Sequence, residues 1–326
     1  MKHNILKIMA LIGMGLFLFL FIKTGPREIF VTLKELTLIH ILILFALRFL
    51  YFALRTLNWK MVLAAYQERI SFTVLLRARL AGYAVGNVTP AAKIGSEVVR
   101  ALMISGGDKK RITASVVVDK TVELLSTACL VTIGVLTALA TVSMEGYQRL
   151  IFLCLLILLI SAVVFLYRKQ KKGLLLWLID GLKKLKLKFK FIEKRRDSLA
   201  ETDSLISRFY VEHKFEFLRV CFLYGLLYAL WVMEIYLTLV FVGTPDISIL
   251  TGFVLVSIGN FANLVPALPA GLGLYEISYV SVFMLLGVPI PIGLAVILTR
   301  RGLSFVWTGI GLIPMLKSSY AQDLRD

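Results

Sequence analysis

Two short segments of the chain place helix-breaking residues beside a carboxylate inside long apolar runs. The first extends from Pro90 to Arg100 and the second from Pro266 to Glu276. The residues that break or turn the backbone in them are Pro90, Gly95, Pro266, Pro269, Gly271 and Gly273. Such residues leave backbone N–H and C=O groups without hydrogen bonds, and lipid offers no partner for them. The breaks therefore persist only where the backbone lines an enclosed or water-filled cavity. Paired breaks in two halves indicate a transporter's binding site, and kinks between unrelated spans are the alternative interpretation.

More charged residues follow each segment at a similar distance within apolar runs. After Glu97, these residues are Asp119, Lys120 and Glu123, which come 22 to 26 positions later. After Glu276, they are Arg300 and Arg301, which come 24 and 25 positions later. A charge that faces lipid at the centre of a helix costs about 2.5 to 3.5 kcal/mol. We therefore expect these side chains, together with Lys93, Glu97 and Arg100, to face inward, where they pair with one another or meet a charged substrate. Ion pairs that only lock helices together are the alternative.

The composition describes a polytopic membrane protein with an all-α fold. Hydrophobic residues make up 59% of the 326 positions, charged residues 17%, and the mean hydropathy is +0.85, which is too apolar for a water-soluble domain. Three cysteines lie far apart in the chain, which excludes a disulfide framework and a thiolate metal site, and the three scattered histidines support neither a His cluster nor a nucleophilic Cys/His pair. Nucleotide-binding and hydrolase motifs are absent. We expect no cofactor, no metal and no catalytic residues.

Six apolar runs reach the roughly 20 residues that a membrane-spanning helix needs. They are residues 5–22, 38–57, 113–142, 150–167, 217–242 and 289–316. Two further runs, residues 72–88 and 248–265, lead into the helix-breaking segments. Single charges within the spans, Arg48, Arg55 and Glu234, are weaker site candidates. We expect Arg55 to snorkel toward the interface, because it lies near the end of its span.

Basic residues gather between Arg168 and Arg219, where fifteen lysines and arginines stand against seven acidic residues. The positive-inside rule predicts that this stretch and the N-terminus are cytoplasmic, in a multi-pass protein of the cell (plasma) membrane. Apolar residues from Leu174 to Ile192 recur at helical spacing among lysines, which predicts an amphipathic interfacial helix. A solvated loop that serves topology only is the alternative. We assign the net charge of +17 to anionic lipid headgroups rather than to nucleic acid.

This orientation predicts that both breaks are tips of re-entrant hairpins. The run from residue 72 begins inside, beside Arg77 and Arg79, and the chain is inside again at Lys109. The first hairpin therefore opens to the cytoplasm. The run from residue 248 begins outside, so the second hairpin opens the opposite way.

The same orientation predicts an inverted repeat within a single membrane domain, residues 1–326. The first unit is residues 38–142, and the second unit is residues 217–316. Residues 168–216 form the basic cytoplasmic loop, with its amphipathic helix, between the units. Inverted repeats usually hold the substrate near the midplane of the bilayer, at the interface of the two units.

Four stretches of the sequence are similar to a known family. They are NVTPAAKIGSEVVR at residues 87–100, VDKTVE at 118–123, LVPALPAGLGLYE at 264–276 and TRR at 299–301. Over nearly its whole length, the chain resembles the transmembrane domain of lysylphosphatidylglycerol synthase and related integral membrane proteins. Ala91, Ser96 and Ala270 stand where the family pattern has glycine. This departure affects the expected backbone conformation of the two helix-breaking segments and leaves the charged residues of the pattern in place.

The resemblance implies a flippase or carrier that moves an anionic lipid between leaflets: a phospholipid, an aminoacyl-phospholipid or a polyprenyl-phosphate-linked lipid. We expect no soluble aminoacyl-transferase domain after residue 316, and therefore no synthase activity. The residues expected to bind the lipid are Lys93, Glu97, Arg100, Asp119, Lys120, Glu123, Glu276, Arg300 and Arg301. An intramembrane transferase that acts on a lipid phosphate, and a lipid-binding scaffold without transport, are the alternatives. The protein could also form a homo-oligomer, which the sequence does not decide.

Overall fold

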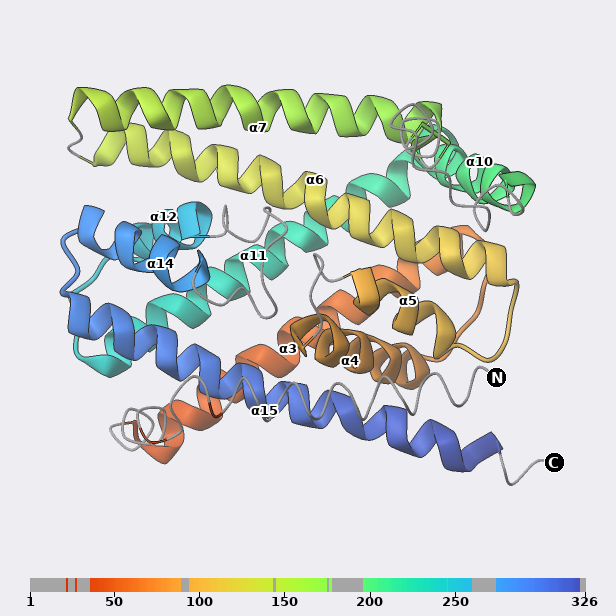
Figure 1. Cartoon of the computed structure of the whole chain (residues 1–326), viewed down its shortest axis with the longest axis horizontal. Coiled ribbons are helices and arrows are strands. Elements are labelled where there is room, and N and C mark those ends of the chain that lie inside the picture. Colours follow the sequence, from red (N-terminus) through yellow and green to blue (C-terminus); the bar gives the residue numbers. More distant parts are fainter. Residues whose placement is uncertain are drawn as a thin grey trace.

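The computed structural model describes residues 22, 27, 36–88, 94–142, 145–174, 176–177, 196–244, 246–259 and 274–322. The ordered elements in these ranges are all helices, which confirms the predicted all-α class (Figure 1). They are α3 (Leu38–Ala65), α4 (Phe72–Val88), α5 (Ile94–Leu102), α6 (Lys109–Thr141), α7 (Gly146–Lys172), α10 (Arg196–Glu212), α11 (Lys214–Val242), α12 (Ile249–Gly259), α14 (Leu274–Leu285) and α15 (Ile290–Gln322).

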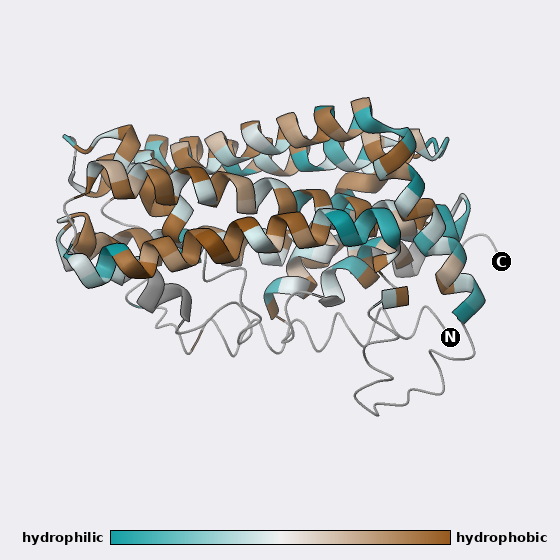
Figure 2. Cartoon of the chain, turned by 90° about the horizontal axis from the view of Figure 1, so that it is seen from above, coloured by the Kyte–Doolittle hydropathy of each residue, from teal (hydrophilic) through white to brown (hydrophobic). Residues whose placement is uncertain are grey.

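Five helices in the described part of the chain are long and apolar enough to cross a membrane. They are α3, α6, α7, α11 and the Ile292–Met315 part of α15. Hydrophobic residues follow the helices through the middle of the molecule, and hydrophilic residues gather at one end of the bundle (Figure 2). The chain is a polytopic membrane protein, as its composition predicts. Residues 5–21 of the first predicted span lie outside the described residues.

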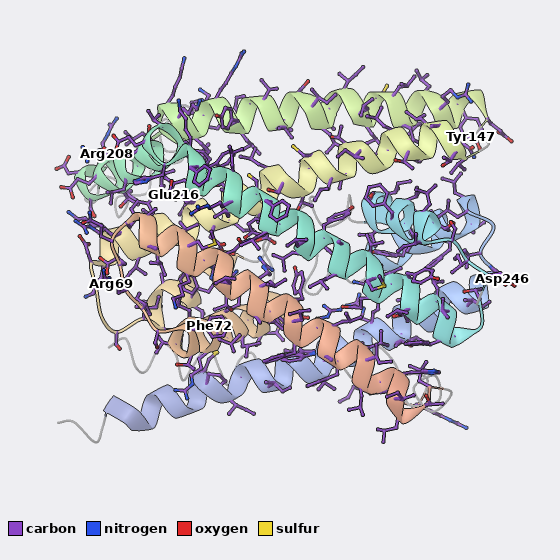
Figure 3. The ribbon with its side chains drawn as sticks, turned by 180° about the vertical axis from the view of Figure 1, so that it is seen from behind. Arg69, Phe72, Tyr147, Arg208, Glu216 and Asp246 are labelled. Atoms are coloured by element: carbon purple, nitrogen blue, oxygen red, sulfur yellow. The ribbon has the colours of Figure 1, made fainter. Side chains whose placement is uncertain are left out.

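The long helices run between two opposite ends of the molecule. Arg69, Arg208 and Glu216 lie at one end, which we call the α10 end, and Tyr147 and Asp246 lie at the opposite end (Figure 3). At the α10 end, α7 finishes and α11 begins, with α10 between them (Figure 1). The described part of the basic stretch therefore lies at a single end of the bundle.

The two halves of the chain pack across each other. α4 lies along α15, α12 lies along α6, and α3 lies beside α11. Two glycines permit close approach: Gly311 of α15 lies against the Leu80 carbonyl of α4, and Gly134 of α6 lies against Ser257 of α12. A Cβ atom at either glycine would overlap the neighbouring helix. Small residues allow such close backbone contacts between membrane helices.

Two pairs of short helices lie between the long ones. α4 packs against α5, and the outer ends of this pair lie toward the α10 end, next to the start of α6 (Figure 1). α12 packs against α14, and the outer ends of that pair lie at the opposite end, next to the start of α15. Gly82 brings α4 close to α5, since a Cβ there would lie 2.7 Å from Cγ of Arg100. Residues 89–93 and 260–273, which join the members of each pair, lie outside the described residues.

The basic stretch contains α10, a helix that the sequence analysis did not single out. Its buried Phe209 and Tyr210 pack in a core formed with α3, α6 and α11. The Tyr210 and Thr121 hydroxyls lie 2.6 Å apart, and burial raises the pKa of Tyr210 above its ordinary value. α10 is therefore docked against the bundle. Residues 178–192 of the predicted amphipathic helix lie outside the described residues.

Candidate functional site

Two clusters of buried charges contain most of the predicted site residues whose side chains the structure describes. The Asp119 cluster joins α3, α4, α5 and α6. It consists of Arg55, Arg79, Glu97, Arg100, Asp119, Lys120 and Glu123. The Glu234 cluster joins α3, α11 and α15. It consists of Arg48, Glu234 and Arg300.

Asp119 of α6 is the centre of the first cluster, and its side chain is fully buried. Its Oδ2 accepts hydrogen bonds from Arg79 of α4 at 3.0 Å and from Arg100 of α5 at 2.6 Å. Its Oδ1 accepts a hydrogen bond from the Tyr224 hydroxyl of α11 at 2.9 Å. A buried carboxylate is tolerated when it is paired and hydrogen-bonded in this way. This single side chain therefore ties both helices of the α4–α5 pair to α6 and α11.

Trp59 of α3 holds the two arginines from the other side. The guanidinium carbons of Arg100 and Arg79 lie 4.2 and 5.5 Å from the centre of the Trp59 ring, within cation–π range. The indole nitrogen of Trp59 donates to Oγ of Ser115 at 3.1 Å, which fixes the ring. Arg79 also donates to the backbone carbonyl of Arg55 at 2.7 Å. Side chains and backbone from several helices thus fix both guanidinium groups.

The partly exposed edge of the Asp119 cluster consists of Arg55, Glu97, Lys120 and Glu123. The Lys120 ammonium lies 3.2 Å from Oε2 of Glu123, and Arg55 pairs with the same carboxylate. Glu97 accepts a hydrogen bond from Arg100 at 2.7 Å. The side chains of Lys120, Glu97 and Glu123 are 27%, 22% and 19% exposed, whereas the central carboxylate is 0% exposed. A ligand that approaches the cluster would meet this edge first.

The Glu234 cluster repeats much of this arrangement in the second half of the chain. Glu234 of α11 forms ion pairs with Arg48 of α3 and with Nε of Arg300 of α15, the latter at 3.4 Å. Arg300 donates to the Tyr279 hydroxyl of α14 at 3.2 Å. Its guanidinium carbon lies 5.6 Å from the centre of the Trp231 ring. Each cluster thus combines a buried carboxylate, two arginines, a tyrosine hydroxyl and a tryptophan ring.

The predicted site residues divide between the clusters and the part of the chain that is not described. The structure brings together Glu97, Arg100, Asp119, Lys120 and Glu123 in the Asp119 cluster. It places Arg300 in the Glu234 cluster, and the buried Arg301 follows it on α15. Gly95 lies in the first turn of α5, and Glu276 lies in α14 with only its backbone described. The predicted residues outside the described part are Lys93, Pro90, Pro266, Pro269, Gly271 and Gly273.

Two arginines lie elsewhere than the sequence interpretation placed them. The prediction that Arg55 snorkels was wrong, because its side chain is 15% exposed and pairs with a carboxylate of α6. Arg79 was grouped with the charges at the inner end of its run, yet its side chain is 3% exposed. Gly82, three residues later on α4, is a sequence signal that could have indicated close helix packing at this position. Tyr224 and Trp59 carried no signal that separates them from other aromatic residues of apolar helices.

Known membrane proteins are similar to this chain over most of its length. The family model described as "Lysylphosphatidylglycerol synthase TM region" matches residues 5–311, which include both charge clusters. A UPF0104 membrane protein of Methanothermobacter thermautotrophicus is 27% identical over 348 aligned positions that cover 100% of this chain and 99% of the relative. A UPF0104 membrane protein of Pyrococcus horikoshii is 24% identical over 283 positions, covering 80% of this chain and 82% of the relative.

Proposed function

The chain belongs to the lysylphosphatidylglycerol synthase TM region family, and from this membership and the two charge clusters we propose that it is a flippase or carrier for an anionic lipid. The lipid is a phospholipid, an aminoacyl-phospholipid or a polyprenyl-phosphate-linked lipid. The protein moves it between leaflets without changing it chemically. The family membership supports a role in lipid handling, and the transport step is our addition.

The observation that carries this proposal is the excess of positive charge in the Asp119 cluster. Among the residues that the structure describes, the cluster holds four cations, Arg55, Arg79, Arg100 and Lys120, against three carboxylates, Glu97, Asp119 and Glu123. A cation within the bilayer is costly unless an anion compensates it. A lipid phosphate supplies that anion and forms strong charge-assisted hydrogen bonds with lysine and arginine.

The geometry supports different roles for the centre and the edge of this cluster. Asp119 holds α4, α5 and α6 together through two arginines and is fully buried. Lys120 is partly exposed and lies against Glu123, which it shares with Arg55. In our proposal the lipid phosphate replaces Glu123 as the partner of Lys120. Lys93, Glu276, Arg300 and Arg301 extend the polar path in the same proposal.

We further propose that the two halves form an inverted repeat with re-entrant helix pairs. The pattern of helix contacts supports this. In the first half α3 packs on α4 and α6, and in the second half α11 packs on α12 and α15 in the same way. Between the halves, α4 lies on α15 and α12 lies on α6. The α4–α5 and α12–α14 pairs have their outer ends at opposite ends of the molecule (Figure 1). Such repeats place a substrate site near the midplane, where alternating access can occur.

The same proposal sets the orientation in the membrane. Residues 168–219 hold fifteen lysines and arginines against seven acidic residues, and the described part of this stretch lies at the α10 end (Figure 3). The positive-inside rule then makes the α10 end cytoplasmic in the plasma membrane. The α4–α5 pair opens to the cytoplasm and the α12–α14 pair opens to the outside.

Reconstitution in liposomes tests the transport step. Purified protein is incorporated into vesicles that contain fluorescent phosphatidylglycerol, and dithionite, which does not cross the membrane, quenches the label in the outer leaflet. We expect wild-type protein to make the inner-leaflet label accessible without nucleotide. We expect Lys120→Gln to slow this step, because it removes the partly exposed cation. Lys110→Gln is the matched control, since Lys110 lies on the same helix but pairs with Glu201 at the α10 end.

Each other outcome points to a specific alternative. If the wild-type protein is no faster than empty liposomes with phosphatidylglycerol, an aminoacyl-phospholipid and a polyprenyl phosphate, the flippase proposal is wrong. Retention of lipid by the purified protein without transport would then favour a scaffold. Chemical conversion of the lipid in the same vesicles would favour a transferase. Equal effects of Lys120→Gln and Lys110→Gln would remove the Asp119 cluster from the transport path.

A further inference from the structure

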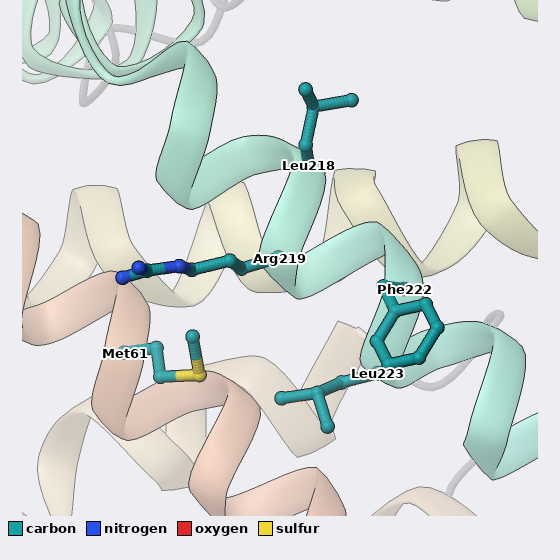
Figure 4. Close-up of a pocket in the computed structure, with 5 residues that line it drawn as sticks. All are labelled: Met61, Leu218, Arg219, Phe222 and Leu223. Carbon is teal, nitrogen blue, oxygen red and sulfur yellow. The ribbon is translucent and has the colours of Figure 1, made fainter.

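A shallow apolar groove lies between α3 and α11, and none of the residues that line it belongs to either charge cluster. Its volume is about 350 Å³, and it is lined by Met61 of α3 and by Leu218, Arg219, Phe222 and Leu223 of α11. Figure 4 shows the Arg219 side chain extended toward α3, beside the side chain of Met61. The groove therefore combines four apolar side chains with one cation.

The groove faces the surroundings of the bundle. Leu218 is 61% and Phe222 is 69% exposed, and both α3 and α11 are candidate membrane spans. Exposed apolar side chains on a membrane span are covered by lipid acyl chains. Arg219 comes five residues after Lys214, the first residue of α11, which is about 7.5 Å along a helix axis. The cation thus lies within the first two turns of α11, at the α10 end of the bundle.

Arg219 offers its charge without an internal counterion in the part of the chain that the structure describes. It forms no ion pair there, and its guanidinium carbon lies 4.2 Å from the centre of the Phe215 ring. Phe215 is itself 62% exposed, so this cation–π contact fixes the guanidinium at the surface without burying it. A fixed arginine beside an apolar groove is complementary to an anionic headgroup with its acyl chain attached.

We propose that this groove binds an anionic glycerophospholipid, with an acyl chain against Met61, Leu218, Phe222 and Leu223 and with the phosphate on Arg219. The site is distinct from the proposed transport path. It fixes a lipid of defined charge to the contact between the first helices of the two halves, α3 and α11. The proposal concerns a bound lipid and does not require that this lipid be transported.

Photocrosslinking tests the site. The photoreactive residue p-benzoylphenylalanine replaces Phe222, and in a second protein it replaces Ile157 of α7, which is similarly exposed at 66%. Both proteins are placed in nanodiscs of equal parts phosphatidylcholine and phosphatidylglycerol with the same acyl chains, and the adducts are identified by mass spectrometry. One basic residue near the surface is worth about 1 kcal/mol toward anionic lipid, so we expect about five-fold enrichment of phosphatidylglycerol at position 222. We expect no enrichment at position 157.

Variants of Arg219 complete the test. Arg219→Gln should abolish the enrichment at position 222, and Arg219→Lys should retain part of it. The same lipid ratio at positions 222 and 157 would overturn the proposal. So would adducts between two protein chains at position 222, or the absence of lipid adducts there when position 157 is labelled. The charge clusters are intact in all these proteins, so such a result would leave the flippase proposal standing.

Discussion

Arg48 and Arg55 lie two turns apart on α3 and pair with carboxylates of different charge clusters. Arg48 pairs with Glu234 of α11, and Arg55 pairs with Glu123 of α6. Residues seven apart occupy nearly the same face of a helix, so one face of α3 contacts both halves of the protein. A displacement of α3 would disturb both ion pairs together, so this helix connects the two clusters, as α11 does through Tyr224 and Glu234.

The pair of Arg55 and Glu123 can be tested by exchanging the charges. Arg55→Glu or Glu123→Arg alone places like charges together in a mostly buried position, and loss of one partner of such a pair costs about 3 to 5 kcal/mol. We expect either single variant to lower the thermal unfolding midpoint in detergent. The double variant restores opposite charges and should recover most of the loss. Additive losses in the double variant would show that the two side chains do not interact.

Asp119 should be the most sensitive carboxylate of its cluster. Asp119→Asn weakens the pairing of both Arg79 and Arg100 in a fully buried position, for which we expect a loss of about 3 to 5 kcal/mol. Glu97→Gln should cost less, because Glu97 is 22% exposed and Arg100 keeps its contact with Asp119. Thermal unfolding in one detergent measures both variants.

The control for this comparison is Glu201→Gln, in the exposed pair with Lys110 at the α10 end. Exposed ion pairs contribute little, and we expect no measurable change in the unfolding midpoint. If Asp119→Asn and Glu97→Gln cause equal shifts, the central role of Asp119 in joining α4, α5 and α6 would be wrong.

The sequence was a better guide to which charged side chains lie inside the protein than to which of them form ion pairs. Asp119, Lys120 and Glu123 stand out because a charge in an apolar run is costly wherever its partner lies. The pairings depend on how helices pack: Arg79 is 40 residues from Asp119, and Arg48 is 186 residues from Glu234. Contacts at such separations cannot be found from local spacing in a single sequence.

Helix ends show the same limit for the fold. The predicted run of residues 72–88 coincides with α4, whereas the run predicted at 289–316 begins one residue before α15, a helix that continues to Gln322. Hydropathy detects the apolar part of a helix and not its end, because a helix can continue beyond the hydrocarbon region. α10 was missed for the same reason, since its sequence is not apolar and its buried face becomes clear only from the helices it contacts.

Gly311 should be the position of α15 least tolerant of a larger residue. A Cβ there would overlap the Leu80 carbonyl and lie 2.9 Å from Cβ of Ala84 on α4, and overpacking of this kind costs about 1 to 3 kcal/mol. We expect Gly311→Ala to lower the unfolding midpoint and to slow lipid movement in liposomes. Gly309 on the same helix has no atom within 4 Å of such a Cβ. Gly309→Ala should be neutral or slightly stabilising, and equal losses in both variants would contradict the close contact of α4 with α15.

The proposed sidedness of the helix pairs can be measured with single cysteines. The native residues Cys129, Cys154 and Cys221 are first replaced. Cysteines are then introduced at four exposed positions, one before and one after each helix pair: Arg69, Gly106, Asp246 and Pro289. Pro289 is preferable to Gly287, because the positive φ of +70° at Gly287 would strain a cysteine. A membrane-impermeant maleimide labels each protein in right-side-out and in inverted vesicles.

We expect the cysteines at positions 69 and 106 to react only from the cytoplasmic face, and those at positions 246 and 289 only from the outer face. This result follows if each helix pair enters the membrane and returns to the same side, as the opposite positions of Arg69 and Asp246 in the bundle suggest (Figure 3). Reaction of positions 69 and 106 from different faces would mean that the α4–α5 pair crosses the membrane. Reaction of positions 246 and 289 from different faces would mean the same for α12 and α14. Either outcome would exclude the inverted repeat, because its two units must begin on opposite sides and each must contain one re-entrant pair.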